Sequence, residues 1–252
     1  MNPLENFPPL YYINLDRRPD RNEHMVKLIA TYGLDGTRVA AVDGKEPIHS
    51  RLDVIPERLR PVEIATTISH LQTIRHWLSH SKSDTAILCE DDVSFDTVSS
   101  WGCSWKHIKE QFPPYWDIVQ LCIIYHPLHE CTISLHHRPT TNFSAACYMI
   151  NRRYAEKLMS LYWNKETKKW RLHGLAPYPL TAEEAIYRPG ACLSIPLFTY
   201  TGTMGSDIQS QDHIDQYHAI SKNIHQFIWK HNTALSLLPM MPPQQIKLNP
   251  QK

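Results

Sequence analysis

The sequence lacks an excess of charge of one sign, a Cys-x-x-Cys pair and a long apolar run. Its 26 Lys and Arg residues balance 25 Asp and Glu residues to a net charge of +1. This balance removes the overall attraction to polyphosphate on which nucleic-acid coating proteins depend, so we expect no nucleic-acid partner. The longest apolar stretch, residues 118–125, is interrupted by Gln120 and is far too short to cross a bilayer, which predicts no membrane span. Peripheral membrane contact stays open.

Export signals are also missing from the sequence. Residues 1–9 contain the acidic Glu5 and several prolines, without the basic and apolar regions of a signal peptide. The six cysteines are spread through the chain and several lie in apolar, strand-like runs, so we expect reduced core thiols. These features predict a cytoplasmic protein in which the sequon at Asn142 is unused.

What the chain does have is a globular composition, with 42% hydrophobic and 20% charged residues, and alternating strand-like and helix-like segments. The strand-like segments are residues 10–15, 38–42, 85–89, 117–125 and 145–150, and helical patterns cover residues 19–32, 62–82 and 155–162. This alternation predicts an α/β sheet covered by helices on both faces, with ligands at the carboxyl ends of the strands. We expect one domain over residues 1–238, ending in a helix at 214–238, and a loose tail at 239–252.

Three carboxylates, Glu90, Asp91 and Asp92, directly follow the predicted strand 85–89. Residues i and i+2 of an extended segment project to the same side, so Glu90 and Asp92 can converge on one cation. Oxygen ligands favour Mg²⁺ or Mn²⁺ over zinc. The alternative interpretation is a solvated acidic turn.

Two other predicted strand ends carry polar groups. The segment from Asn14 to Arg21 combines a strand-to-helix turn with several arginines, which suits a diphosphate, although it lacks the glycines of a Walker loop. A charged surface cap is the alternative. Asp43 and Gly44 follow the predicted strand 38–42, where the carboxylate can accept from a ribose hydroxyl or a base N–H, or can simply form a turn.

A cluster of possible zinc ligands occupies one short stretch. Its members are His126, His129, Cys131, His136 and His137. Their spacing matches no established zinc framework, so we interpret the stretch as a polar loop after a strand.

Several motifs occur together in the order and rough spacing of one known family. They are YYINLDRRPDRNEHM, RVAAVDG, SHLQTIRHWL with ILCEDDVSF, WDIVQL and SAACYMINRRYAEKL. In combination they resemble glycosyltransferase family 25, which holds bacterial lipopolysaccharide glycosyltransferases and collagen hydroxylysine galactosyltransferases. The resemblance covers about residues 10 to 208.

The resemblance implies a GT-A-like nucleotide-sugar-binding fold, with a mixed, mostly parallel sheet flanked by helices. It implies an inverting enzyme that moves a hexose, galactose or glucose, from a UDP-sugar donor to a glycan, lipid-linked or protein hydroxyl acceptor. Glu90 and Asp92 would hold Mn²⁺ (or Mg²⁺) against the donor diphosphate, where the cation neutralises charge on the leaving UDP. The residues implied to line the nucleotide sugar are Asn14, Leu15, Arg17, Arg21, Asp43, Gly44, Ser69, His70 and Asp91.

The chain departs from the family pattern around the acceptor. Thr66 and Thr67 replace a Gly-Cys pair, and residues 181–186 replace a Val-Asp-x-x-Leu segment. Glu183 aligns best with the missing Asp and is the implied general base, with Glu184 as the alternative.

Two other possibilities stay open from the sequence. Thr181 and Glu184 also fit a helix capping box, and Asp207 or His213 is a further candidate metal ligand. The alternative functions are a catalytically idle nucleotide- or glycan-binding module of the same fold and a Mg²⁺-dependent phosphohydrolase.

Overall fold

A mixed sheet forms the centre of the computed structural model, which describes residues 2–54, 56, 59–124, 134–140, 142–172, 181–201, 204–205 and 221–226. The strand order is β2-β1-β4-β8-β6-β11-β5, with β7 paired to β11. The strands are β1 (Leu10–Asn14), β2 (Gly36–Ala40), β4 (Thr85–Glu90), β5 (Val93–Ser94), β6 (Ile118–Cys122), β7 (His136–His137), β8 (Cys147–Asn151) and β11 (Cys192–Tyr200). Strands β2, β1, β4, β6 and β11 share one direction, and β8 runs against them. The predicted α/β class with a mostly parallel sheet is confirmed.

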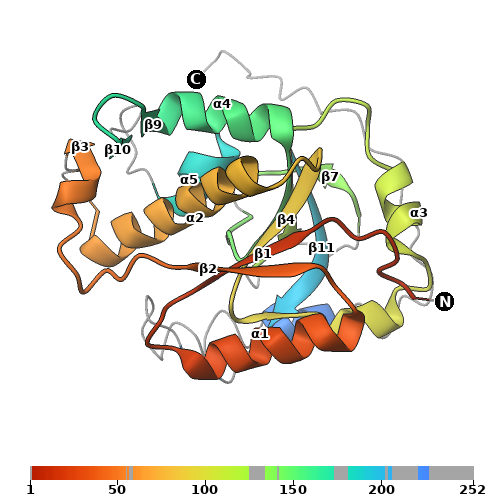
Figure 1. The fold of residues 1–252 in the computed structure, drawn as a ribbon. Helices are drawn as coiled ribbons and strands as arrows, with labels where there is room; N and C mark the ends of the chain where they lie inside the picture. The colour runs from red at the N-terminus through yellow and green to blue at the C-terminus, as the bar shows by residue number, and fades with distance from the viewer. Residues whose placement is uncertain are drawn as a thin grey trace, which may run out of the picture.

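Helices cover both faces of this sheet (Figure 1). Helix α1 (Pro19–Tyr32) lies on one face, and α2 (Pro61–His80), α4 (Arg152–Tyr162) and α5 (Ala182–Tyr187) lie on the other. The shorter elements are η1 (His49–Arg51), η2 (Asp96–Ser100), α3 (Trp105–Glu110) and a separate three-stranded sheet of β3 (Leu52–Val54), β10 (Lys169–Arg171) and β9 (Trp163–Asn164). Within the described residues, no helix is both long enough and apolar enough to span a membrane.

The boundaries of α1 follow from its sequence. Pro19 occupies the first turn, where its missing N–H has no intrahelical partner to lose. Met25 and Leu28 are buried on one stripe, and Gly33 ends the helix in the left-handed conformation at a φ of 62°. The helix therefore begins and ends where the sequence predicts.

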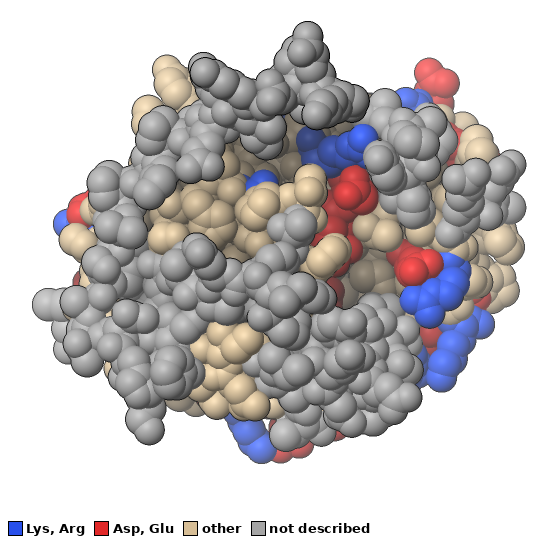
Figure 2. All heavy atoms as spheres, turned by 180° about the vertical axis from the view of Figure 1, so that it is seen from behind, with Lys and Arg blue, Asp and Glu red and all other residues tan. Residues whose placement is uncertain are grey.

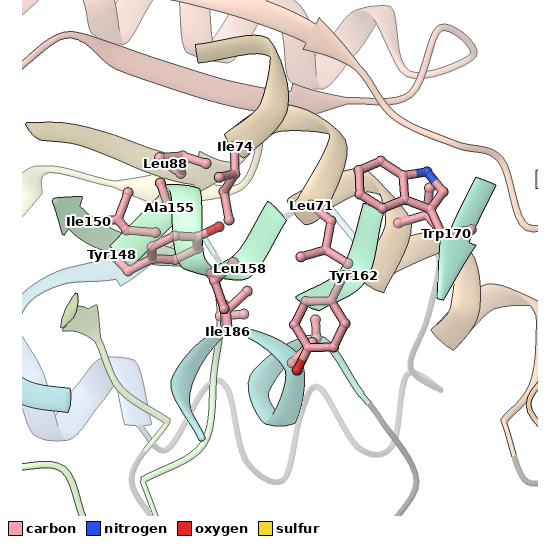
Figure 3. Close-up of a cluster of buried hydrophobic side chains, with 14 of the residues drawn as sticks. Leu71, Ile74, Leu88, Tyr148, Ile150, Ala155, Leu158, Tyr162, Trp170 and Ile186 are labelled. Atoms are coloured by element: carbon pink, nitrogen blue, oxygen red, sulfur yellow. The ribbon is translucent and has the colours of Figure 1, made fainter. Parts of the chain in front are cut away.

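Alternate residues of each central strand enter two different apolar clusters. Tyr11, Leu88 and Tyr148 pack toward α2, α4 and α5, in the cluster that Figure 3 shows in part. Tyr12 and Ile87 point to the opposite face, toward α1 and α3. Because both faces of the sheet are covered, the central strands β1, β4 and β8 are largely apolar and buried along their length, whereas the edge strand β2 is mostly exposed.

The structure differs from the sequence predictions in one strand boundary, in the acidic segment and in one additional strand. The predicted strand 38–42 is Gly36–Ala40, because its register on β1 begins at Leu10↔Gly36 and ends at Asn14↔Ala40. Glu90 closes β4, and Asp91 and Asp92 form a turn rather than an extended segment. Strand β11, the longest in the sheet, was not predicted. The predicted tail, and all of the predicted helix 214–238 except the helical residues 221–226, lie outside the described residues.

Candidate functional site

The candidate site lies where three parallel strands end. Asn14 of β1 pairs with Ala40 of β2, and Ile13 of β1 pairs with Glu90 of β4. The segments that follow β1 and β2 and the acidic turn after β4 therefore meet at one edge of the sheet. This is the edge at which open α/β sheets bind ligands.

These segments surround a cavity of about 300 Å³, here called the first cavity. Every predicted nucleotide and metal residue except Asn14 lines it: Leu15, Arg17, Arg21, Asp43, Gly44, Ser69, His70, Glu90, Asp91 and Asp92. Its other lining residues include apolar side chains of β1 and α2 and the cation Lys45. The cavity thus combines an apolar slot, three cations and the acidic turn.

Asp91, which is implied to line the nucleotide sugar, is bound on both carboxylate oxygens by other side chains of the protein. Its Oδ1 lies 2.6 Å from Arg21 Nη1, and its Oδ2 accepts a hydrogen bond of 2.7 Å from Asn14 Nδ2. Burial raises the pKa of Asp91, although Arg21 acts in the opposite direction. Asn14 is itself buried and also accepts from Arg38. Asn14 and Asp91 therefore hold the acidic turn in place. Asn14, a predicted nucleotide contact, is not among the residues that line the first cavity.

Glu90 and Asp92 are the other two carboxylates of the acidic turn, and both line the first cavity. Arg21 Nη1 lies 3.3 Å from Asp92 Oδ2, while Asp92 Oδ1 is buried with no hydrogen-bond partner in the described part of the chain. Burial, followed by the charges of Glu90 and Asp91, raises the pKa of Asp92 to about 7 despite Arg21. A divalent cation would satisfy Oδ1 and relieve this repulsion, so the two residues fit one.

The carboxylates do not form a complete metal cage. Among the described residues, no group of three or more His, Cys, Asp or Glu side chains is arranged to hold a metal ion. Mg²⁺ and Mn²⁺ sites that act on phosphates are usually of this open kind, with one or two carboxylates and oxygens from the substrate. Asp207 and His213, the other candidate ligands, lie outside the described residues.

His70 connects the acidic turn to the core. Its Nε2 lies 3.3 Å from Glu90 Oε1, and its Nδ1 lies 3.2 Å from the hydroxyl of Tyr148. Since a carboxylate can only accept, the tautomer that satisfies both contacts carries its proton on Nε2 and accepts from Tyr148 at Nδ1. Such an outer contact orients a metal-binding carboxylate. Tyr148 was not predicted, because only the pairing of β4 with β8 brings it beneath the turn.

The opposite wall of the cavity is built by the loop after β2. Asp43 Oδ2 accepts a 2.6 Å hydrogen bond from Arg17 Nε, which lowers the pKa of Asp43, and Oδ1 accepts from the Lys45 N–H. Gly44 passes so close to α2 that an added Cβ would lie 2.7 Å from Val62 Cα. Ser69 Oγ accepts from the Val42 N–H at 2.9 Å. The loop is therefore tied both to β1 and to α2.

A second cavity, of about 190 Å³, adjoins the first. The two share Thr66, Glu90 and Asp92 as lining residues. Glu183 of α5 also lines the second cavity, so its carboxylate shares this cavity with those of Glu90 and Asp92.

Glu184, the alternative base, is placed differently. Its N–H lies 3.4 Å from Thr181 Oγ1, so the Thr181 half of the predicted capping box forms. Its carboxylate lies 3.4 Å from Arg188 Nη1 and not on the backbone of Thr181, so the other half of the box does not form. Glu184 is not among the residues that line either cavity. The geometry thus favours Glu183 of the two glutamates.

Sequence comparison places the chain in no known group. No family of known proteins and no curated protein matches its sequence. The fold is similar to that of A197 from STIV, with a TM-score of 0.44 and 9% identity over 77% of this chain and 84% of that one. It is also similar to the inositol-1-phosphate CTP transferase from T. maritima, with a TM-score of 0.37 and 11% identity over 88% of this chain and 79% of that one.

The structure describes only part of the stretch that holds the possible zinc ligands. Three of the possible zinc ligands in the stretch interpreted as a polar loop, His126, His129 and Cys131, lie outside the described residues. His136 has its Nδ1 2.9 Å from the Ser134 carbonyl and its Nε2 3.1 Å from Asn142 Nδ2, so both ring nitrogens have protein partners.

Charge is mixed on the face drawn in Figure 2, where acidic and basic side chains of the described residues lie next to one another.

Proposed function

We propose that the protein is a metal-dependent, inverting glycosyltransferase that binds a UDP-sugar in the first cavity and a hydroxyl acceptor in the second. The observation that carries the proposal is that Glu90 and Asp92 line both cavities. A sugar attached to a diphosphate at these carboxylates would present its anomeric carbon to the neighbouring cavity. The motif resemblance to glycosyltransferase family 25, with galactose or glucose as the sugar, agrees with this arrangement. A cytoplasmic location remains part of the proposal.

The residues of the first cavity have separable roles in this reaction. Arg17 and Lys45 supply positive charge for the diphosphate, and the apolar slot takes the base. Arg21 is held on Asp91 and Asp92, so it positions the acidic turn. A Mn²⁺ or Mg²⁺ ion on Glu90 and Asp92 would supply Lewis-acid stabilisation of the leaving diphosphate.

Glu183 acts on the acceptor side. It takes the proton from the acceptor hydroxyl as that oxygen forms its bond to the anomeric carbon. The bond from this carbon to the diphosphate oxygen breaks with its electron pair, and UDP leaves. Attack from the face opposite the diphosphate inverts the configuration at the anomeric carbon.

Release of UDP from UDP-galactose and UDP-glucose tests the proposal. With Mn²⁺ and a hydroxyl acceptor present, we expect release that stops in EDTA and in Asp92→Asn. The matched control is Asp96→Asn, which alters an exposed carboxylate in η2.

The remaining outcomes separate the competing functions. UDP binding without turnover for any acceptor would indicate an idle binding module. Breakdown of the UDP-sugar at the same rate without acceptor would indicate a hydrolase. Equal UDP affinity in Mn²⁺ and in EDTA, measured by calorimetry, would remove the metal from the proposal.

A further inference from the structure

Three side chains mark the boundary between the two cavities of the candidate site. Among the residues that the structure describes, Thr66 of α2 and the carboxylates Glu90 and Asp92 are the ones that line both cavities. Glu90 and Asp92 belong to the acidic turn and carry the charge that suits a cation. Thr66 is the neutral member of the three, and the proposed chemistry gives it no role.

The position of Thr66 on α2 explains why it lines both cavities. Val62 lines the first cavity and Glu63 lines the second, and two consecutive residues of a helix point about 100° apart. Thr66 follows Val62 by four residues and Glu63 by three, and residues at these spacings are neighbours on the helix surface. The Thr66 side chain therefore lies between the two directions, where the cavities meet.

The hydroxyl of Thr66 has a fixed hydrogen-bonding role. Its Oγ1 donates a 2.9 Å hydrogen bond to the Val62 carbonyl, one helical turn earlier. This bond selects one rotamer of the β-branched side chain. Because a hydroxyl has a single proton, Oγ1 can act toward a ligand only as an acceptor. Thr66 is partly buried, so the boundary carries an acceptor oxygen at a set place.

A sugar that is transferred between the cavities must lie at this boundary. In the proposed reaction the diphosphate occupies the first cavity, and the anomeric carbon is open to the acceptor in the second. A hexose is a neutral polyol, and each of its hydroxyl groups can donate one hydrogen bond. A site that hydrogen-bonds a substrate hydroxyl discriminates against a substrate that lacks a hydroxyl at the matching position.

We propose that Thr66 recognises the hexose of the donor, with its Oγ1 accepting a hydrogen bond from a hydroxyl of the transferred sugar. This role rests on the proposed function, which places the sugar at the boundary. Thr66 then selects and binds the hexose. It takes no part in proton transfer and makes no contact on which UDP itself depends.

Calorimetric titrations with UDP, UDP-galactose and UDP-glucose in the presence of Mn²⁺ test this role. Thr66→Val keeps the shape of the side chain and removes the hydroxyl. We expect it to lower the affinity for the more tightly bound UDP-sugar by about 2- to 10-fold, as for one neutral hydrogen bond, and to leave UDP affinity unchanged. Thr66→Ser keeps the hydroxyl, so its UDP-sugar affinity should stay closer to that of the unmodified protein.

The matched control is Thr67→Val, at the next residue of the same helix. Thr67 Oγ1 also donates to the carbonyl four residues earlier, that of Glu63, at 2.9 Å. Thr67 is not among the residues that line either cavity. Thr67→Val thus removes the same kind of intrahelical hydrogen bond and should leave UDP-sugar affinity unchanged. Thermal melting of each variant shows whether it is folded, and the comparison of Thr66→Val with Thr66→Ser stands without this control.

The outcomes separate the role of Thr66 from the proposed function. Unchanged UDP-sugar affinity in Thr66→Val, an equal loss for UDP and UDP-sugar, or the same loss in Thr67→Val would each overturn the sugar contact and leave the proposed glycosyltransferase in place. If neither UDP nor either UDP-sugar binds the unmodified protein, the donor site itself is overturned, and the sugar contact with it.

Discussion

His70 is a buried contact of Glu90, one of the two proposed metal ligands. Its imidazole is 1% exposed and lies between Glu90 and Tyr148. Loss of this contact removes one of the groups that orient the Glu90 carboxylate, and removal of such outer partners typically lowers metal affinity by about 10- to 100-fold. We expect His70→Ala to weaken Mn²⁺ binding, measured by calorimetry in the presence of UDP, by a factor in this range.

The control for that prediction is on the same helix. His80→Ala removes an exposed imidazole at the end of α2 and should leave Mn²⁺ affinity unchanged. Unaltered Mn²⁺ affinity in His70→Ala would show that Glu90 is positioned without it, or that it is not a ligand.

The two glutamates of α5 give the second residue-level prediction. Glu183 lines the second cavity, whereas Glu184 faces Arg188 in an exposed pair. Removing a general base costs about 10²–10⁴ in rate, and removing one partner of an exposed ion pair costs little. We expect Glu183→Gln to bind Mn²⁺ and UDP normally but to lose single-turnover transfer by this factor, with Glu184→Gln close to the unmodified rate. The opposite pattern would make Glu184 the base.

The loop after β2 packs against the start of α2, and this packing fixes the side of the first cavity to which Gly44 belongs. A methyl group on Gly44 would lie 2.7 Å from the backbone of Val62, so either the loop or the start of α2 must move. Since Gly44 lines the first cavity, we expect Gly44→Ala to lower UDP affinity by about tenfold or more, because misplacement by an ångström is costly at such sites. Calorimetric titration with UDP and Mn²⁺ measures the loss.

Gly33, at the end of α1 and not among the residues that line the first cavity, provides the matched control. Its φ of 62° makes alanine unfavourable, but a Cβ there would meet nothing within 4 Å. Gly33→Ala should therefore destabilise the fold by about 1 kcal/mol, seen in denaturant unfolding, without changing UDP affinity. Equal UDP affinities in Gly44→Ala and Gly33→Ala would exclude the loop from nucleotide binding.

Ligand binding should be visible in the stability of the whole molecule. Asp92 Oδ1 is buried without a hydrogen-bond partner among the residues that the structure describes, and burial raises the pKa of Asp92, so the native state is destabilised there. A cation and a diphosphate that bridge this point bind only the native state and stabilise it by mass action. At about 100 times the dissociation constant, we expect Mn²⁺ plus UDP to raise the melting temperature by about 5–10 °C, and by more than the sum of the separate effects.

Asp92→Asn is the control for this thermal experiment. It removes the charge that joins the two ligands, so the Mn²⁺ and UDP shifts should become independent of each other. Independent shifts in the unmodified protein would mean that metal and nucleotide bind at separate places.

Local sequence patterns were sufficient for the elements that depend on neighbouring residues. Pro19, the stripe of Met25 and Leu28, and Gly33 set α1, because helix boundaries follow from caps and from periodicity within one segment. The acidic turn was located because Glu90 ends an apolar strand. The motif resemblance to glycosyltransferase family 25, and not the local pattern, indicated most of the residues that line the first cavity, including Ser69 and His70 of α2.

Tertiary structure alone decided the features that depend on which strands pair. The antiparallel insertion of β8 between β4 and β6 brings Tyr148 beneath His70, and no pattern within one segment specifies that pairing. Asn14 was assigned to the nucleotide, yet its amide is used by Asp91, because the turn after β4 folds back onto β1. The sequence by itself thus determined which residue types gather at the strand ends. The folded sheet determined which of them bond to each other and which face a cavity, because hydrogen-bond partners are chosen by proximity in space.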